Sequence, residues 1–214
     1  MTAPAVPLLE LILERGTGDP VDERVLNAAL AAFLDFGVRR TSMGEIAKRS
    51  GVSPATLYRK FAGKDEVVWA VGRREVRRLI AGVDAQIDAR ASAEDQMVGL
   101  FVAFLQGLRQ NQLLQRLLAT EPEIVLPLLT TQAGPVLALG RAYLADFIGR
   151  LHGPLNLPPE EVEPAAEMVA RVALSMALTP QTCLPVEDEA ALRRFARRYL
   201  AGIFGVAAPP GRIP

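Results

Sequence analysis

The chain has 214 residues, half of them hydrophobic, and 24 Lys and Arg residues balance 24 Asp and Glu residues. This length and composition favour a compact soluble protein with room for one large domain or two modest ones. No apolar run approaches the roughly 18 to 20 residues of a membrane span, so we expect no membrane crossing.

The cysteine content and the N-terminal segment indicate in which cellular compartment the protein is expected. Cys183 is the only cysteine, which excludes an internal disulfide and a multi-cysteine metal site, and we expect it to be a small buried hydrophobe. The first twenty residues hold three prolines but neither a basic start nor a small-residue cleavage site. They do not fit a secretion signal, so we expect a cytoplasmic protein.

Apolar residues recur at helical spacing along almost the whole chain, and no alternating run suggests a strand. The pattern predicts an all-α fold, with helices separated by glycine and proline. The predicted helices cover residues 22–36, 43–50, 54–61, 64–87, 93–109, 111–119, 123–131, 135–152, 160–178 and 188–204.

Positive charge is concentrated in one part of this neutral chain. Between residues 38 and 64, seven basic residues stand against Glu45 alone, a local charge of plus six. All three lysines of the protein, Lys48, Lys60 and Lys64, lie in this window. A basic region on an otherwise acidic body is typical of a protein that neutralises DNA phosphates locally, although a solvated helical face is the alternative.

Two short predicted helices lie within the basic window. Ser42 and Glu45 fit a capping box, in which the serine oxygen accepts from the amide three residues on and the glutamate reaches back. Gly51 allows a positive φ for a tight turn, Ser53 can cap the next helix, and Pro54 suits its first position. This arrangement predicts a helix-turn-helix whose second helix enters the major groove.

The predicted helix-turn-helix divides its side chains by role. Ile46, Ala47, Val52, Leu57 and Phe61 form its apolar inner face. Ala55, Thr56 and Arg59 are the candidates to read base edges, because methyl, hydroxyl and guanidinium groups match the major-groove pattern. The predicted phosphate contacts are Thr41, Ser42, Tyr58, Lys60 and Lys64, and Ser53 completes the predicted DNA-binding set. Taken singly, Ser53, Thr56, Tyr58 and Arg59 are better explained as caps, packing and surface charge.

Taken together, these positions resemble the tetracycline-repressor (TetR) family. The resemblance is carried by Ala28, Ala29, Phe33, Gly37, Thr41, Ile46, Ala47, Gly51, Val52, Ser53, Thr56, Leu57, Tyr58, Phe61, Lys64 and Asp65. Pro54 and Ala55 depart mildly from the family pattern, which leaves the base preference open. The resemblance implies an all-helical homodimer with a three-helix N-terminal DNA-binding domain and a divergent C-terminal domain that binds a small effector and dimerises.

We therefore expect four segments. Residues 1–20 form a partly flexible extension, 21–64 the DNA-binding domain, 65–207 the effector-binding and dimerisation domain, and 208–214 a tail. The last predicted helix is strongly amphipathic, and the helix before it is apolar on more than one side. The two form either a four-helix dimer interface, as the resemblance suggests, or contacts within one subunit. The predicted dimer contacts are Val169, Ala173, Ala177, Phe195, Tyr199 and Ile203.

The C-terminal half carries enough apolar side chains to line an effector pocket or to fill a solid core. The predicted lining is Phe101, Phe104, Leu105, Leu118, Tyr143, Phe147, Met168, Val172 and Met176. Such a lining favours an apolar or amphipathic effector. Glu121 and Glu123 could hold a polar group of that effector or mark a helix start. His152 has no evident metal partners, and we expect no cofactor or metal.

The sequence thus predicts a regulator, most simply a repressor, that binds a palindromic operator as a homodimer and is released by the effector. The alternative is a ligand-independent DNA-binding or architectural protein whose C-terminal half only dimerises or binds a protein partner. The usual catalytic motifs are absent from the sequence, so an enzyme is not expected.

Overall fold

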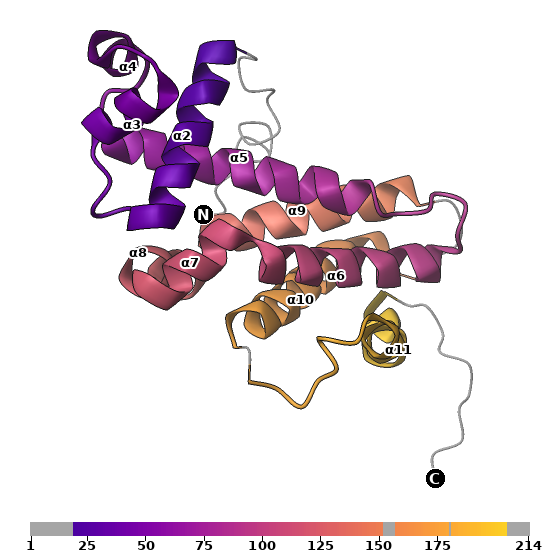
Figure 1. Cartoon of the computed structure of the whole chain (residues 1–214). Coiled ribbons are helices and arrows are strands. Elements are labelled where there is room, and N and C mark those ends of the chain that lie inside the picture. The colour runs from indigo at the N-terminus through magenta and orange to yellow at the C-terminus, as the bar shows by residue number, and fades with distance from the viewer. Residues whose placement is uncertain (1–18, 152–156, 180, 205–214) are drawn as a thin grey trace.

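The computed structural model describes residues 19–151, 157–179 and 181–204, which form helices and no strand (Figure 1). The predicted all-α fold is confirmed. Its α-helices are α2 (Pro20–Phe36), α3 (Met43–Ser50), α4 (Pro54–Lys60), α5 (Lys64–Asp84), α6 (Ala93–Gln110), α7 (Gln112–Thr120), α8 (Pro122–Leu129), α9 (Gly134–Arg150), α10 (Pro159–Leu178) and α11 (Glu189–Tyr199). A 3-10 turn, η1 (Ala201–Phe204), follows α11. The predicted tail, His152 and nearly all of the predicted N-terminal extension lie outside the described residues.

The helix boundaries agree with the predicted ones to within a few residues, and three of the differences lie in the first, fourth and last helices. The first helix begins at Pro20, and the cap is Asp19, whose Oδ1 accepts from the N–H of Val21 at 2.8 Å. The fourth predicted helix ends at Asp84 rather than at residue 87. The last helix ends at Tyr199, and the chain continues to residue 204 as the tighter 3-10 turn.

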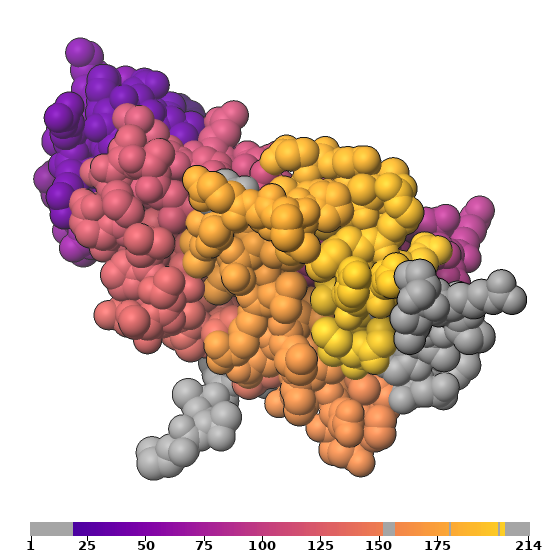
Figure 2. Space-filling view, turned by 90° about the horizontal axis from the view of Figure 1, so that it is seen from below, coloured from indigo at the N-terminus to yellow at the C-terminus, as the bar shows by residue number. Residues whose placement is uncertain are grey.

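The N-terminal helices pack around a core of their own. It combines buried side chains of α2, α3 and α4 with Val67, Ala70 and Val71 from the first half of α5. Leu113 of α7 completes it, and Figure 2 shows the segment of α7 and α8 lying directly against the N-terminal helices. Two short helices of seven and eight residues would be marginal alone, so they depend on this packing.

The second half of α5 belongs to a larger core in the C-terminal half. There α6, α9, α10 and α11 enclose a continuous apolar cluster that includes Leu100, Leu105 and Leu192. Helices α5 and α6 approach closely, because a Cβ on Gly107 would lie 2.3 Å from Cδ1 of Leu79. Helix α5 therefore contributes to both cores and links them (Figure 1).

A buried arginine fastens α5 to α2. Arg74 is 3% exposed, and its guanidinium donates to the carbonyl of Leu26 at 3.1 Å and to Oδ1 of Asn27 at 2.9 Å. It also pairs with Glu23 at 3.4 Å. Burial, followed by the charge of Arg78, lowers the pKa of Arg74.

Two further observations bear on expectations from the sequence. Cys183 is exposed in the segment between α10 and α11, so the prediction that it is buried was wrong. Among the described residues, no single helix has the length and apolar composition of a membrane span, although α8 and α9, bent by 55° at their junction, pass that test as a pair.

Candidate nucleic-acid interface

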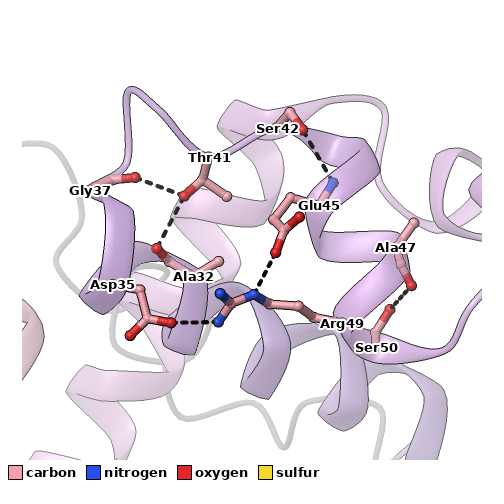
Figure 3. Close-up of polar contacts among 9 residues, drawn as sticks. All are labelled: Ala32, Asp35, Gly37, Thr41, Ser42, Glu45, Ala47, Arg49 and Ser50. Carbon is pink, nitrogen blue, oxygen red and sulfur yellow. Dashed lines mark hydrogen bonds and ion pairs between the residues drawn. The ribbon is translucent and has the colours of Figure 1, made fainter.

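The start of α3 is capped by Ser42, as predicted. Its Oγ accepts from the N–H of Glu45 at 3.1 Å (Figure 3). The second half of the predicted capping box was wrong, because the Glu45 carboxylate accepts from Arg49 Nε at 2.7 Å instead of reaching back to the cap. Arg49 also donates to Asp35 of α2 at 2.7 Å, so this pair ties α3 to α2 (Figure 3).

The turn between α3 and α4 has the predicted glycine geometry. Gly51 adopts φ 68° and ψ 20°, the left-handed conformation, and its N–H donates to the carbonyls of Ala47 and Lys48. The hydroxyl of Ser50 donates to the Ala47 carbonyl at 3.1 Å (Figure 3), and the N–H of Val52 reaches the same carbonyl at 3.2 Å. These bonds give partners to the carbonyls of Ala47 and Lys48 at the end of α3, where the chain turns into α4.

Helix α4 presents most of its predicted DNA-reading side chains to solvent. Ser53 caps it by accepting from the N–H of Thr56 at 3.2 Å, and its hydroxyl donates to Thr56 Oγ1 at 2.9 Å. Leu57 is fully buried and holds the helix to the N-terminal core. Ala55 and Arg59 are exposed on α4, while Thr56 is half-buried. Tyr58, a predicted phosphate contact, is 55% exposed.

The hydroxyl of Thr41, a predicted phosphate contact, points into the protein. Thr41 is 2% exposed, and its Oγ1 donates to the carbonyl of Gly37 at 2.7 Å and to that of Ala32 at 3.2 Å (Figure 3). This corrects the predicted role of its side chain, because a hydroxyl used in this way closes the end of α2. Ser42 remains exposed beside it.

Two lysines predicted to contact phosphates already have partners. Lys60 pairs with Asp22 at 2.7 Å and with Asp19, and hydrogen bonds to Asp19 and then Asp22 raise the pKa of Lys60. Lys64 donates to the carbonyls of Val38 at 3.2 Å and Arg39 at 3.1 Å. Each ammonium thus uses two of its three donors among the described residues, but a phosphate at Lys60 would also meet two carboxylates.

The basic window is therefore partly neutralised in the folded chain. Arg39 pairs with Glu123 at 2.8 Å, and Arg49 and Lys60 are paired as described. The cations of this window that are exposed and have no carboxylate partner within the described ranges are Arg40, Lys48 and Arg59. Arg40 and Lys48 were missed as individual DNA contacts, although both were counted in the local charge.

Part of the predicted dimer set lies inside one subunit. Val169, Ala173 and Ala177 are at most 5% exposed and pack in the C-terminal core. They are not available to a second subunit, so this part of the prediction is corrected. Phe195 and Ile203 are half-buried against the same core. Tyr199 is 59% exposed, with its ring centroid 5.1 Å from that of Phe195.

Most of the predicted pocket lining comes together as a packed core. Phe101, Leu105, Tyr143, Phe147 and Met176 are buried in the C-terminal cluster, and Phe104 and Val172 pack against it. Leu118 is half-buried on α7, outside this cluster, and Met168 is 55% exposed on α10. Leu118 and Met168 therefore lie apart from the rest of the predicted lining, whose side chains belong to this one cluster.

One polar contact lies at the edge of that core. The hydroxyl of Tyr143 on α9 donates to Oδ1 of Asp84, the last residue of α5, at 2.7 Å. Burial, followed by this hydrogen bond, raises the pKa of Tyr143.

Two of the surface hollows formed by the described residues lie beside helices of this half. One, of about 220 Å³, lies between α5 and α6, with Glu75, Arg78 and Asn111 in its lining. The other, of about 380 Å³, lies over α9 and α10 beside Arg141 and Met168. Neither is lined by the predicted aromatic set.

Comparison with known proteins gives this architecture a family. Residues 25–71 match the model of bacterial regulatory proteins of the tetR family, and residues 88–197 match that of the bacterial tetracycline repressor C-terminal domain. The HTH-type transcriptional repressor Rv3405c of Mycobacterium tuberculosis is 33% identical over 143 residues, 64% of this chain and 76% of that protein. The HTH-type transcriptional activator FasR of Mycolicibacterium smegmatis is 33% identical over 118 residues, which are 51% of this chain and 54% of that protein. The chain thus spans about half the length of FasR.

Solved structures share the fold. The TetR family repressor AlkX from Dietzia sp. superposes with a TM-score of 0.62 at 19% identity, covering 85% of this chain and 98% of that one. Salmonella enterica GusR gives 0.56 at 21% identity, covering 89% and 98%. The chain belongs to the tetR family of bacterial regulatory proteins and is a DNA-binding, helix-turn-helix transcriptional regulator.

Proposed function

We propose that this regulator is a repressor that binds a palindromic operator as a homodimer, with α4 in the major groove of each half-site. The observation that carries the proposal is the outer surface of α4, on which Ala55, Tyr58 and Arg59 are exposed. The helix itself is capped by Ser53 and held to the N-terminal core by Leu57. Arginine on such a surface can bond both acceptors of a guanine, and an alanine methyl can touch thymine.

The phosphate contacts that position α4 come from its surroundings. Arg40 and Lys48 are exposed cations without carboxylate partners among the described residues, and Lys64 keeps one donor. Each cation that meets a phosphate releases counterions, so binding weakens as salt is raised. Of the two mycobacterial relatives, Rv3405c is a transcriptional repressor and FasR is a transcriptional activator.

A palindromic operator requires a two-fold protein. Met168 on α10 and Tyr199 on α11 are large hydrophobic side chains that are more than half exposed on the two helices expected to dimerise. We propose that these outward faces, rather than the buried Val169 face, meet a second subunit. Sedimentation of the wild type and of Met168→Glu tests this, with a dimer expected for the first and a shift to monomer for the second.

The test of DNA binding is selection from a random-sequence duplex library, followed by fluorescence anisotropy on the recovered duplex. We expect a recovered sequence with two-fold symmetry and an affinity that falls steeply between 50 and 200 mM salt, by about 10³-fold or more for six or more phosphate contacts. Recovery of no sequence above random DNA would refute the proposal.

For the effector we propose an apolar or amphipathic small molecule, because the C-terminal core that would receive it is built from aromatic and aliphatic side chains. The packed state of that core favours a second candidate, a ligand-independent DNA-binding protein. A thermal-shift screen of fatty acids and aromatic hydrocarbons separates the two. A ligand that raises the melting temperature and releases the duplex supports the first, and no hit supports the second.

A further inference from the structure

The loop between α2 and α3 is bound by a side chain from the C-terminal half. The N–H of Val38 donates to Oε2 of Glu121 at 2.6 Å, and the N–H of Arg39 donates to Oε1 at 2.8 Å. Glu121 lies between α7 and α8 and is 7% exposed. Each oxygen of this buried carboxylate thus binds a backbone amide that is more than eighty residues away in the sequence.

This contact holds the loop in position. Two successive N–H groups that converge on one anion form a concave anion site, and both bonds are charge-assisted. Two bonds to neighbouring amides restrain the rotation of the backbone as well as its distance. Gly37 fits closely here, because it has φ 85° and a Cβ on it would lie 2.9 Å from Glu121 Oε2. The loop conformation and the carboxylate position are therefore matched.

The same loop is held from its other sides by the N-terminal helices. Lys64 of α5 binds the carbonyls of Val38 and Arg39, and Thr41 binds the carbonyls of Gly37 and Ala32. Ser42, the cap of α3, follows directly. A shift of this loop would therefore be passed to the start of α3 and, through the Gly51 turn, to α4.

Apolar contacts accompany the carboxylate. Leu113 belongs to the N-terminal core, and Leu117 and Ile124 pack against it from α7 and α8. Apolar burial is non-directional, so these side chains hold the two parts together without fixing an angle between them. The paired hydrogen bonds of Glu121 supply the direction.

We propose that Glu121 is a positioning residue for DNA binding, the contact through which the turn between α7 and α8 fixes the orientation of α3 and α4. A movement of that turn carries the loop with it and changes how α4 meets the major groove. The effect on DNA rests on the proposed function, whereas the contact itself does not.

The experiment compares three variants of the full chain with the wild type. Glu121→Gln keeps the shape but leaves one acceptor for two amides. Glu123→Gln is the matched control, because it removes a carboxylate two residues away that pairs with the exposed side chain of Arg39. Val125→Ala, at a buried position of α8, controls for lost stability. Amide exchange at Val38 and Arg39 is measured by NMR. DNA affinity is measured by fluorescence anisotropy on the duplex that the wild type selects.

Both measurements are made well below the melting temperature. In Glu121→Gln we expect amide exchange at Val38 and Arg39 to be about tenfold faster and the affinity for the duplex to be at least about fivefold weaker. Glu123→Gln and Val125→Ala should stay within about twofold of the wild type in both measurements, since neither removes the contact. If Glu121→Gln does not fold, Glu121→Asp, which keeps the charge and shortens the reach, takes its place with the same expected results.

Unchanged exchange at Val38 and Arg39 would show that the contact is not made, and overturn the inference. Faster exchange with wild-type affinity would show that the contact does not position α4, and equal losses in Val125→Ala would reduce it to general stability. If the wild type selects no duplex, the proposed function is refuted instead. The exchange measurement then still tests whether Glu121 binds the amides of Val38 and Arg39.

Discussion

The N-terminal motif and the C-terminal half are both helical, but their structures are specified differently. The motif is built from helices of seven and eight residues, and its shape depends on two serine caps, a left-handed glycine and the buried hydroxyl of Thr41. The C-terminal half is built mainly from helices of 11 to 20 residues around one apolar core. Position-specific polar groups thus define the first region, whereas apolar volume defines the second.

The largest expected effect contrasts the two cores. Leu57 is the buried residue of α4, so Leu57→Ala should lower the free energy of unfolding by about 2–5 kcal/mol and detach α4. Leu105 is equally buried in the C-terminal core, yet the volume-conserving change Leu105→Met should cost less than about 1.5 kcal/mol. Urea unfolding followed by circular dichroism measures both, and a larger loss for Leu105→Met would contradict the contrast.

The next effect separates two glycines of the motif. Gly37→Ala places a Cβ at positive φ and against Glu121, and should cost about 1–3 kcal/mol of backbone strain in addition to the contact. Gly51→Ala meets nothing within 4 Å and should cost only the left-handed penalty, about 1–2 kcal/mol. Thermal unfolding ranks them. Equal losses of stability in the two variants would mean that the Glu121 carboxylate moves away from the new Cβ at no cost.

The two caps should have a smaller effect. Ser42→Ala and Ser53→Ala each remove an acceptor from a helix start and should each lower the free energy of unfolding by about 1 kcal/mol. Replacement by Asp should restore most of it, because Asp is an equally good cap. If the Asp variants are no more stable than the Ala variants, the caps do not specify the motif.

The smallest expected effect appears at alkaline pH and concerns Tyr143 in the C-terminal half. Because the folded state raises the pKa of Tyr143, the unfolded chain loses this proton first as pH rises. The stabilisation is complete below the ordinary tyrosine pKa of about 10 and is lost above it. Tyr143→Phe should therefore show a shallower loss of stability above about pH 10 in pH-dependent thermal unfolding. Parallel curves for the two proteins would remove Tyr143 as the cause.

The same contrast explains what the sequence could predict. The helix boundaries and the α3–α4 turn follow from caps, prolines and Gly51, which act within a few residues. The inward face of α10 could not be predicted, because its apolar residues spread over more than one side and helical spacing does not say which side a second subunit covers. Glu121 and Arg74 were missed as ties because their partners lie about fifty or more residues away. Only the tertiary fold brings such pairs together.

The central claim, that α4 reads DNA, is tested most directly at Arg59. On the duplex selected by the wild type, Arg59→Ala should lose about 1–3 kcal/mol of binding and relax the preference at one base pair in each half-site, with unchanged stability. The control is Arg194→Ala, which removes an exposed arginine from α11. Wild-type affinity and base preference in Arg59→Ala, or the same loss in Arg194→Ala, would contradict the account.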